Sequence, residues 1–211
     1  MALAKIVFLG RARQQISRMV TDSPTFLIKR AVGEADRLTD HAAQAAQQIL
    51  AQRSTRAMRE RWLGNDAFRR YFGTGDLTKQ QLKKVCNVIV TLNDRVDKGL
   101  TIKVRPKSGS KSGLCRGDRN AYQASGFLGA RKMNLCWGWF HITDSTERGA
   151  ILIHELVHAT GIGWTRDLPV DNPARGAAEA RQFALNDPKN ARRNPENMAH
   201  FLLALVGHPG T

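Results

Sequence analysis

The sequence predicts an α+β fold, mostly helical with a small central sheet, and three observations support this expectation. Many apolar side chains in the first half recur every three or four positions, which is the period of an amphipathic helix. The middle of the chain contains β-like runs at 101–105 and 133–142. Residues that favour helix starts, each followed by proline, then recur toward the C-terminus. Segregated helices and strands of this kind are typical of α+β domains.

Length and composition indicate a globular protein. The chain has 211 residues, of which 42% are hydrophobic and 24% are charged, and this excludes disordered and collagen-like classes. We expect a helical N-terminal extension at 1–34 and a single domain at 35–211. No apolar run reaches about 18 residues, so no membrane span is expected.

The chain is strongly basic, because it contains 33 Lys and Arg residues and 18 Asp and Glu residues, which gives a net charge of +15. Such a chain attracts anionic partners without selecting among nucleic acid, acidic lipid headgroups, anionic cell-surface polymers and acidic proteins. Ile6 to Leu9 form the apolar run nearest the N-terminus, which is shorter than the roughly 7–15 residues of a secretory h-region. We therefore expect secretion by a specialised route, with the cytoplasm as the alternative.

Two helices are well specified in the first half. Ser23-Pro24 resembles an N-cap with proline at the first helical position, and a stripe follows at Leu38, Ala42, Ala45 and Ile49. Thr78 and Gln81 have the spacing of a capping box. The apolar stripe of that second helix, which Gly99 should end, comprises Leu82, Val85, Ile89, Leu92 and Val96. Cys86 beside it is expected to be buried.

The second half alternates between extended and helical patterns. Residues 133–142 are apolar and aromatic and predict one or two strand segments around Gly138. Asp144 and Glu147 form a capping signature for a helix that runs to about Ala159. Asn172-Pro173 and Asn194-Pro195 predict two closing helices.

The chemistry-bearing motif is His-Glu-Leu-Val-His at 154–158, inside the helix that Asp144 begins. Positions i and i+4 lie on one helix face, so His154 and His158 can direct their rings at one metal ion. Zinc accepts two imidazoles and a carboxylate and keeps one position open in catalytic sites. Glu155, one position further around the helix, is placed to take a proton from an activated water.

A third zinc ligand is still needed, and the sequence leaves several acids open. Asp167 is nearest to the motif, and Glu179 on the next helix is its rival. Asp171 and Asp187 are the other acidic candidates. No His lies close after Gly161, so a third imidazole is not expected.

With these residues the chain resembles the deuterolysin and peptidyl-Lys metalloendopeptidases, the aspzincins, as a divergent bacterial-type member. The likeness extends over about 35–205 and includes Phe-Arg-Arg-Tyr-Phe-Gly at 68–73 and Asn-Leu-Cys-Trp-Gly-Trp-Phe at 134–140. It also includes the segment 193–201, Arg-Asn-Pro-Glu-Asn-Met-Ala-His-Phe. The resemblance implies a zincin-like metallopeptidase fold and zinc as the cofactor.

The resemblance also implies roles for single residues. Trp-Thr-Arg-Asp at 164–167 aligns with the family's ligand motif and makes Asp167 the third zinc ligand. Arg175 takes the place of a family Tyr that stabilises the tetrahedral intermediate. Glu196 and Ala199 take the places of two acids that bind the substrate's Lys in Lys-specific members. Cys115 and Cys136 match a family disulfide and are expected to pair in an oxidising compartment.

The function expected from sequence is that of a zinc-dependent endopeptidase with a protein or peptide substrate, used as a secreted effector or toxin. An immunity or chaperone protein is then an expected partner. One alternative is a basic nucleic-acid-binding module, because Lys103, Arg105, Lys107 and Lys111 form a basic run. The other is a catalytically inactive zincin, because Arg175 replaces the Tyr.

Overall fold

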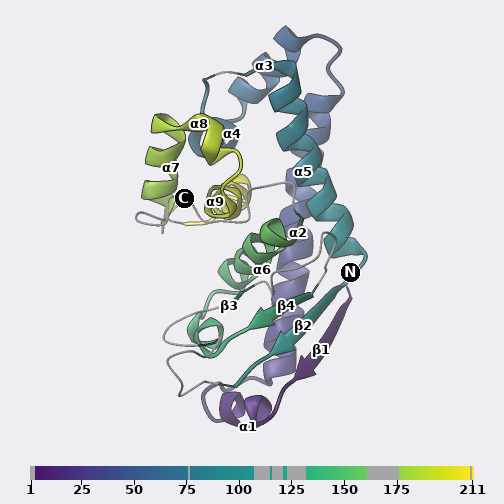
Figure 1. Ribbon diagram of the computed structural model, residues 1–211, viewed down its shortest axis with the longest axis vertical. Coiled ribbons are helices and arrows are strands. Elements are labelled where there is room, and N and C mark those ends of the chain that lie inside the picture. The colour runs from purple at the N-terminus through teal and green to yellow at the C-terminus, as the bar shows by residue number, and fades with distance from the viewer. Residues whose placement is uncertain are drawn as a thin grey trace.

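A computed structural model of the chain describes residues 3–75, 77–106, 115, 121–122, 132–160, 176–209 and 211. These residues are mostly helical with one small sheet, so the predicted α+β class is confirmed. The molecule is elongated: α2 runs along much of its length, the sheet lies toward one end, and α7, α8 and α9 lie to one side of the other half (Figure 1).

The elements follow in chain order. The helices are α1 (Ala12–Ser17), α2 (Pro24–Leu50), α3 (Thr55–Gly64), α4 (Asp66–Phe72), α5 (Lys79–Asp97), α6 (Ser145–Thr160), α7 (Ala177–Asn186), α8 (Pro188–Ala191) and α9 (Pro195–Leu205). The strands are β1 (Ala4–Phe8), β2 (Leu100–Val104), β3 (Ala121–Tyr122) and β4 (Lys132–Leu135). Within the described ranges, no helix is both long and apolar enough to cross a bilayer.

The two helices that the sequence specified best are confirmed. α2 begins after Ser23 with Pro24 at its first turn. α5 begins with the complete Thr78–Gln81 capping box, and its apolar stripe is buried throughout. Gly99 follows α5 with a φ of +85°, a left-handed conformation that glycine adopts without steric cost, and the chain turns there into β2.

The sheet has the strand order β1-β2-β4-β3, in which the first three strands are parallel and β3 is antiparallel to β4. β1 pairs with β2 from Ala4↔Leu100 to Phe8↔Val104, so this part of the expected helical extension is a strand instead. The reason is non-local, because among the described strands β1 pairs with β2 alone, which lies far along the chain. The expected boundary between 34 and 35 falls inside α2, which continues without a break.

The aromatic segment after β4 also differs from the expectation. Residues Trp137–His141 form a 3₁₀ helix and not a second strand. Trp139 and Phe140 are buried, and an apolar run that short has no period that separates a strand from a helical turn. Cys136, just before this turn, is disulfide-bonded to Cys115 as the family resemblance implied, and Cys86 is a buried thiol.

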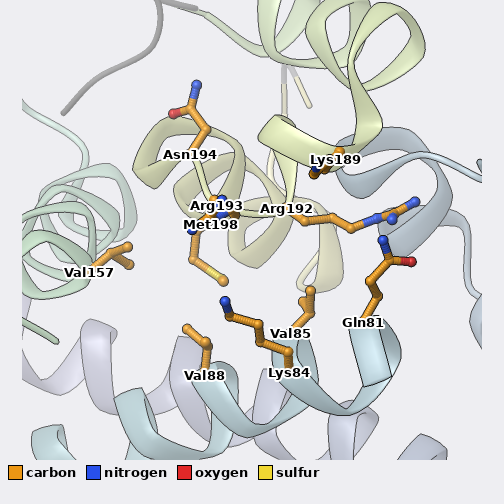
Figure 2. A pocket seen from close by; sticks show the side chains of 10 residues that line it. All are labelled: Gln81, Lys84, Val85, Val88, Val157, Lys189, Arg192, Arg193, Asn194 and Met198. Carbon is orange, nitrogen blue, oxygen red and sulfur yellow. The ribbon is translucent and has the colours of Figure 1, made fainter. Parts of the chain in front are cut away.

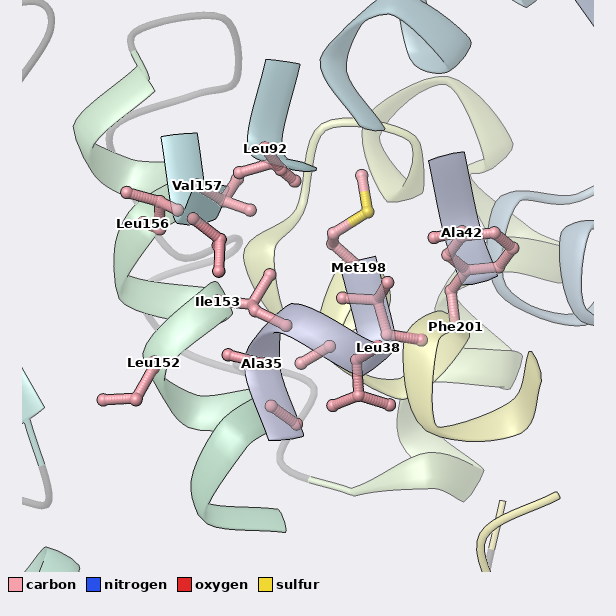
Figure 3. Packing of buried hydrophobic residues seen from close by; sticks show 14 of the residues in the cluster. Ala35, Leu38, Ala42, Leu92, Leu152, Ile153, Leu156, Val157, Met198 and Phe201 are labelled. Carbon is pink, nitrogen blue, oxygen red and sulfur yellow. The ribbon is translucent and has the colours of Figure 1, made fainter. Parts of the chain in front are cut away.

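The core that positions α6 is a three-helix contact. Figure 3 shows apolar side chains of α6, among them Ile153 and Leu156, in one cluster with Leu38 of α2 and Phe201 of α9. α2 and α6 approach each other closely at Gly149 of α6. A Cβ atom placed on Gly149 would lie 2.9 Å from the backbone nitrogen of Ala35 and 3.1 Å from the carbonyl oxygen of Ala31. The backbone of α2 therefore requires glycine here.

We expect Gly149→Ala to lower the free energy of unfolding by about 1–3 kcal/mol, because the added methyl group overpacks the contact between α2 and α6. Urea unfolding followed by circular dichroism measures the change. Gly33→Ala is the matched control: Gly33 lies within α2 with no atom near its Cβ position, so alanine should stabilise the protein by about 0.5–1 kcal/mol. Equal effects of the two substitutions would contradict the close approach at Gly149.

Candidate metal centre

The helix that carries the motif begins where the sequence predicts. The Asp144 carboxylate accepts hydrogen bonds from the backbone N–H groups of Thr146 at 2.7 Å and Glu147 at 2.9 Å. These bonds, above all the one from Glu147, lower the pKa of the exposed Asp144 carboxyl and so favour its charged form as the helix cap. α6 then runs from Ser145 to Thr160, which places the whole 154–158 motif inside one regular helix.

The core contact fixes the rotation of α6. Leu152, Ile153, Leu156 and Val157 are all buried. His154 and His158 are left partly exposed on the neighbouring face. Glu155 is buried, with 8% of its surface exposed.

The two motif imidazoles converge. His154 Nε2 lies 3.3 Å from His158 Nε2, and the rings are inclined by 67° with their centroids 5.0 Å apart. Two nitrogens bound to one tetrahedral zinc at the usual Zn–N distance would be about 3.3 Å apart. The side chains present therefore fit two corners of a zinc site.

Glu196 of α9 lies directly behind His154. Its Oε2 is 3.1 Å from His154 Nδ1, and its Oε1 is 3.3 Å from His200 Nε2. Burial raises the pKa of Glu196, but the close approach of the His154 and His200 rings outweighs burial and lowers the pKa to about 2. When the neutral His154 ring donates its Nδ1 proton to this carboxylate, Nε2 carries the lone pair that a metal requires.

Polar contacts of the surrounding helices hold Glu196 in place. The Asn194 side chain caps α9 by accepting a hydrogen bond from the Glu196 backbone N–H at 2.8 Å. Asn197 Nδ2 donates to the carbonyl oxygens of Tyr71 at 2.8 Å and Ala180 at 2.7 Å, which ties α9 to α4 and α7. The His200 ring stacks on Tyr71, with 6.0 Å between ring centroids.

The structure brings some predicted site residues together and leaves others untested. His154, His158 and Glu196 are in contact, and Glu155 is in the same helix. Three predicted site residues fall outside the described residues: Asp167, Asp171 and Arg175. Among the residues described, no group of three or more His, Cys, Asp or Glu side chains is arranged to hold a metal.

The other acidic candidates have different surroundings. Glu179 is exposed in the first turn of α7. Asp187 caps α8 by accepting from the Asn190 backbone N–H at 3.2 Å. Neither joins the two histidines in a metal-binding group of described residues.

Sequence reasoning missed the contacts around Glu196. His200 follows Glu196 by four positions, a helical spacing that could have indicated a pair. Tyr71, by contrast, belongs to a distant segment, so no local spacing could reveal its contact with His200.

The whole fold resembles that of a zinc peptidase. A zinc peptidase from Grifola frondosa superposes with a TM-score of 0.60 at 17% sequence identity, over 88% of this chain and 99% of that one. The zincin-like peptidase fold is therefore shown. No family model matches the sequence, and a search of curated proteins also finds no match.

Proposed function

We propose that this chain is a zinc-dependent endopeptidase. The observation that carries the proposal is the 3.3 Å separation of His154 Nε2 and His158 Nε2, which fits one zinc ion. The fold shared with a zinc peptidase supports it. Asp167 is proposed as the third ligand and Glu196 as the carboxylate that orients His154.

Each residue then has a distinct role in peptide hydrolysis. Bound zinc supplies Lewis acidity that polarises the scissile carbonyl and lowers the pKa of a water. Glu155 takes a proton from the attacking water while the water oxygen bonds to the carbonyl carbon. Glu155 then delivers a proton to the leaving amine as the C–N bond breaks. Arg175 is proposed to stabilise the negative charge on the carbonyl oxygen, because a fixed cation can replace a hydroxyl donor there.

The proposed role of Glu196 differs from the one the resemblance implied. Both of its carboxylate oxygens face imidazoles, and Ala199, the position of the second acid in Lys-specific relatives, is a buried alanine. This arrangement favours positioning of a zinc ligand over binding of a substrate Lys. Carboxylates behind metal-bound histidines fix the tautomer and orientation of the ring.

A role as a delivered effector or toxin that acts on a target-cell protein is the finer form of the proposal. The disulfide between Cys115 and Cys136 supports maturation in an oxidising compartment. The net charge of +15 supports attraction to an anionic target. An immunity or chaperone protein would belong to this role.

We expect purified protein to contain about one zinc per chain by elemental mass spectrometry, and Glu155→Gln to retain it. Glu155→Gln should cleave a peptide library about 10²–10⁴-fold more slowly than the wild-type protein, because glutamine cannot accept the water proton. The metal content of Glu155→Gln serves as the control for folding. Cleavage at the wild-type rate would contradict the assignment of Glu155, and a protein that takes up no zinc would contradict the endopeptidase.

The third ligand is tested by comparing two acids. Asp167→Ala should weaken zinc binding by more than about 100-fold in a chelator competition, since loss of a direct ligand costs more than loss of an outer contact. Glu179→Ala should leave the affinity unchanged. The opposite order would move the ligand to α7.

Glu196→Ala should lower zinc affinity by about 10–100-fold, because His154 loses its orienting acceptor. Glu196→Gln should recover part of this loss, since its amide oxygen can still accept from Nδ1. Chelator competition measures both, with Glu179→Ala as the matched surface control. If zinc affinity stayed constant while KM rose only for substrates with Lys, the substrate-binding role would hold instead.

A further inference from the structure

A second site lies on the other side of the first turn of α9 from Glu196. A partly open cavity of about 130 Å³ lies between α5, α6, α8 and α9 (Figure 2). Its apolar wall consists of Val85, Val88, Val157 and Met198. Residues advance by about 100° around a helix, so Met198 lies about 200° from Glu196 and faces away from the histidines.

Cations from three segments surround this apolar wall. Lys84 comes from α5, Lys189 from α8 and Arg193 from the turn before α9. Lys84 and Lys189 are exposed and make no ion pair or hydrogen bond with any described residue. No acidic side chain is among the described residues that line the cavity.

The remaining polar lining is already used by the fold. The Arg192 guanidinium donates to the carbonyl oxygens of Phe72, at 3.0 Å, and Gly75. Gln81 belongs to the capping box of α5. The groups that remain available to a ligand are therefore the apolar wall and the positive charges at its border.

Size limits the apolar part of the ligand. A cavity of about 150 Å³ lined by apolar side chains holds one benzene molecule, so this pocket of about 130 Å³ has room for a single large side chain such as Phe or Leu. The cations belong to separate segments, so one carboxylate attached to that group could not neutralise them all. Several acids flanking one apolar residue would match the charges better.

We propose that this pocket binds an acidic polypeptide segment that inserts one large apolar side chain. A nucleic acid fits less well, because the described lining contains no aromatic side chain on which a base could stack. The site is separate from the proposed zinc centre, so its occupation does not depend on catalysis. The proposal thus assigns to one part of the basic surface a ligand of defined chemistry, an acidic polypeptide segment with one large apolar side chain.

Fluorescence anisotropy with a labelled peptide, Glu-Asp-Glu-Phe-Glu-Asp-Glu, tests the proposal on the full chain carrying Glu155→Gln, which is expected to slow cleavage strongly. We expect saturable binding that weakens as salt rises. Replacing Phe by Ser, or the acids by their amides, should each weaken binding at least about tenfold. Equal affinity of either altered peptide would overturn the proposal.

Substitutions in the protein locate the site. Lys84→Glu should weaken binding of the peptide by at least about tenfold, because it places a carboxylate at the rim. Lys83→Glu is the matched control, since Lys83 is the exposed neighbour on α5 and does not line the cavity. Equal losses in both variants would indicate a general charge effect and overturn the proposal.

Two further probes separate other ligands. A single-stranded oligonucleotide that competed with the peptide at equal concentration, and lost binding in Lys84→Glu, would assign the pocket to nucleic acid instead. A small aryl carboxylate, 3-phenylpropionate, should compete only at far higher concentration than the peptide. Equal potency would make the pocket a small-molecule site and overturn the peptide assignment.

Discussion

The close contact between α2 and α6 is the constraint on which the rest of the site depends. Gly149 lets the two backbones meet, and the apolar face of α6 then sets the rotation of the helix about its axis. A rotation of α6 by one residue, about 100°, would carry both histidines together away from their position beside α9. The spacing of His154 and His158 brings their rings together, and packing of the neighbouring face sets the direction in which both rings point.

α9 supplies the carboxylate that orients a histidine of α6. α9 presents Glu196 to His154 because Asn194 caps its first turn and Asn197 fastens it to α4 and α7. A partly buried carboxylate is costly unless charged or polar partners compensate for lost water. Here two imidazoles do so, and the low pKa of Glu196 is their result. The same compensation fixes the ring of His154.

Features with a local cause could be predicted from the sequence. The capping box of α5, the start of α6 at Asp144 and the shared face of His154 and His158 each depend on residues a few positions apart. Non-local features could not be predicted in this way. β1 is a strand only because β2 pairs with it, and the contact of Glu196 with His154 joins two helices that the sequence separates. The disulfide was expected only from the family resemblance, since spacing alone does not give connectivity.

The two sides of the first turn of α9 separate two kinds of electrostatic environment. On one side the partly buried Glu196 carboxylate has both of its oxygens directed at imidazole rings of the protein, those of His154 and His200. On the other side the exposed cations Lys84 and Lys189 have no acidic partner in the described structure, so their charge acts on solvent and solutes. A basic surface binds selectively only where shape adds to charge, and the apolar cavity beside these cations supplies that shape. Part of the net charge of +15 therefore lies beside a cavity with room for one side chain, and at this place positive charge and shape can select a ligand together.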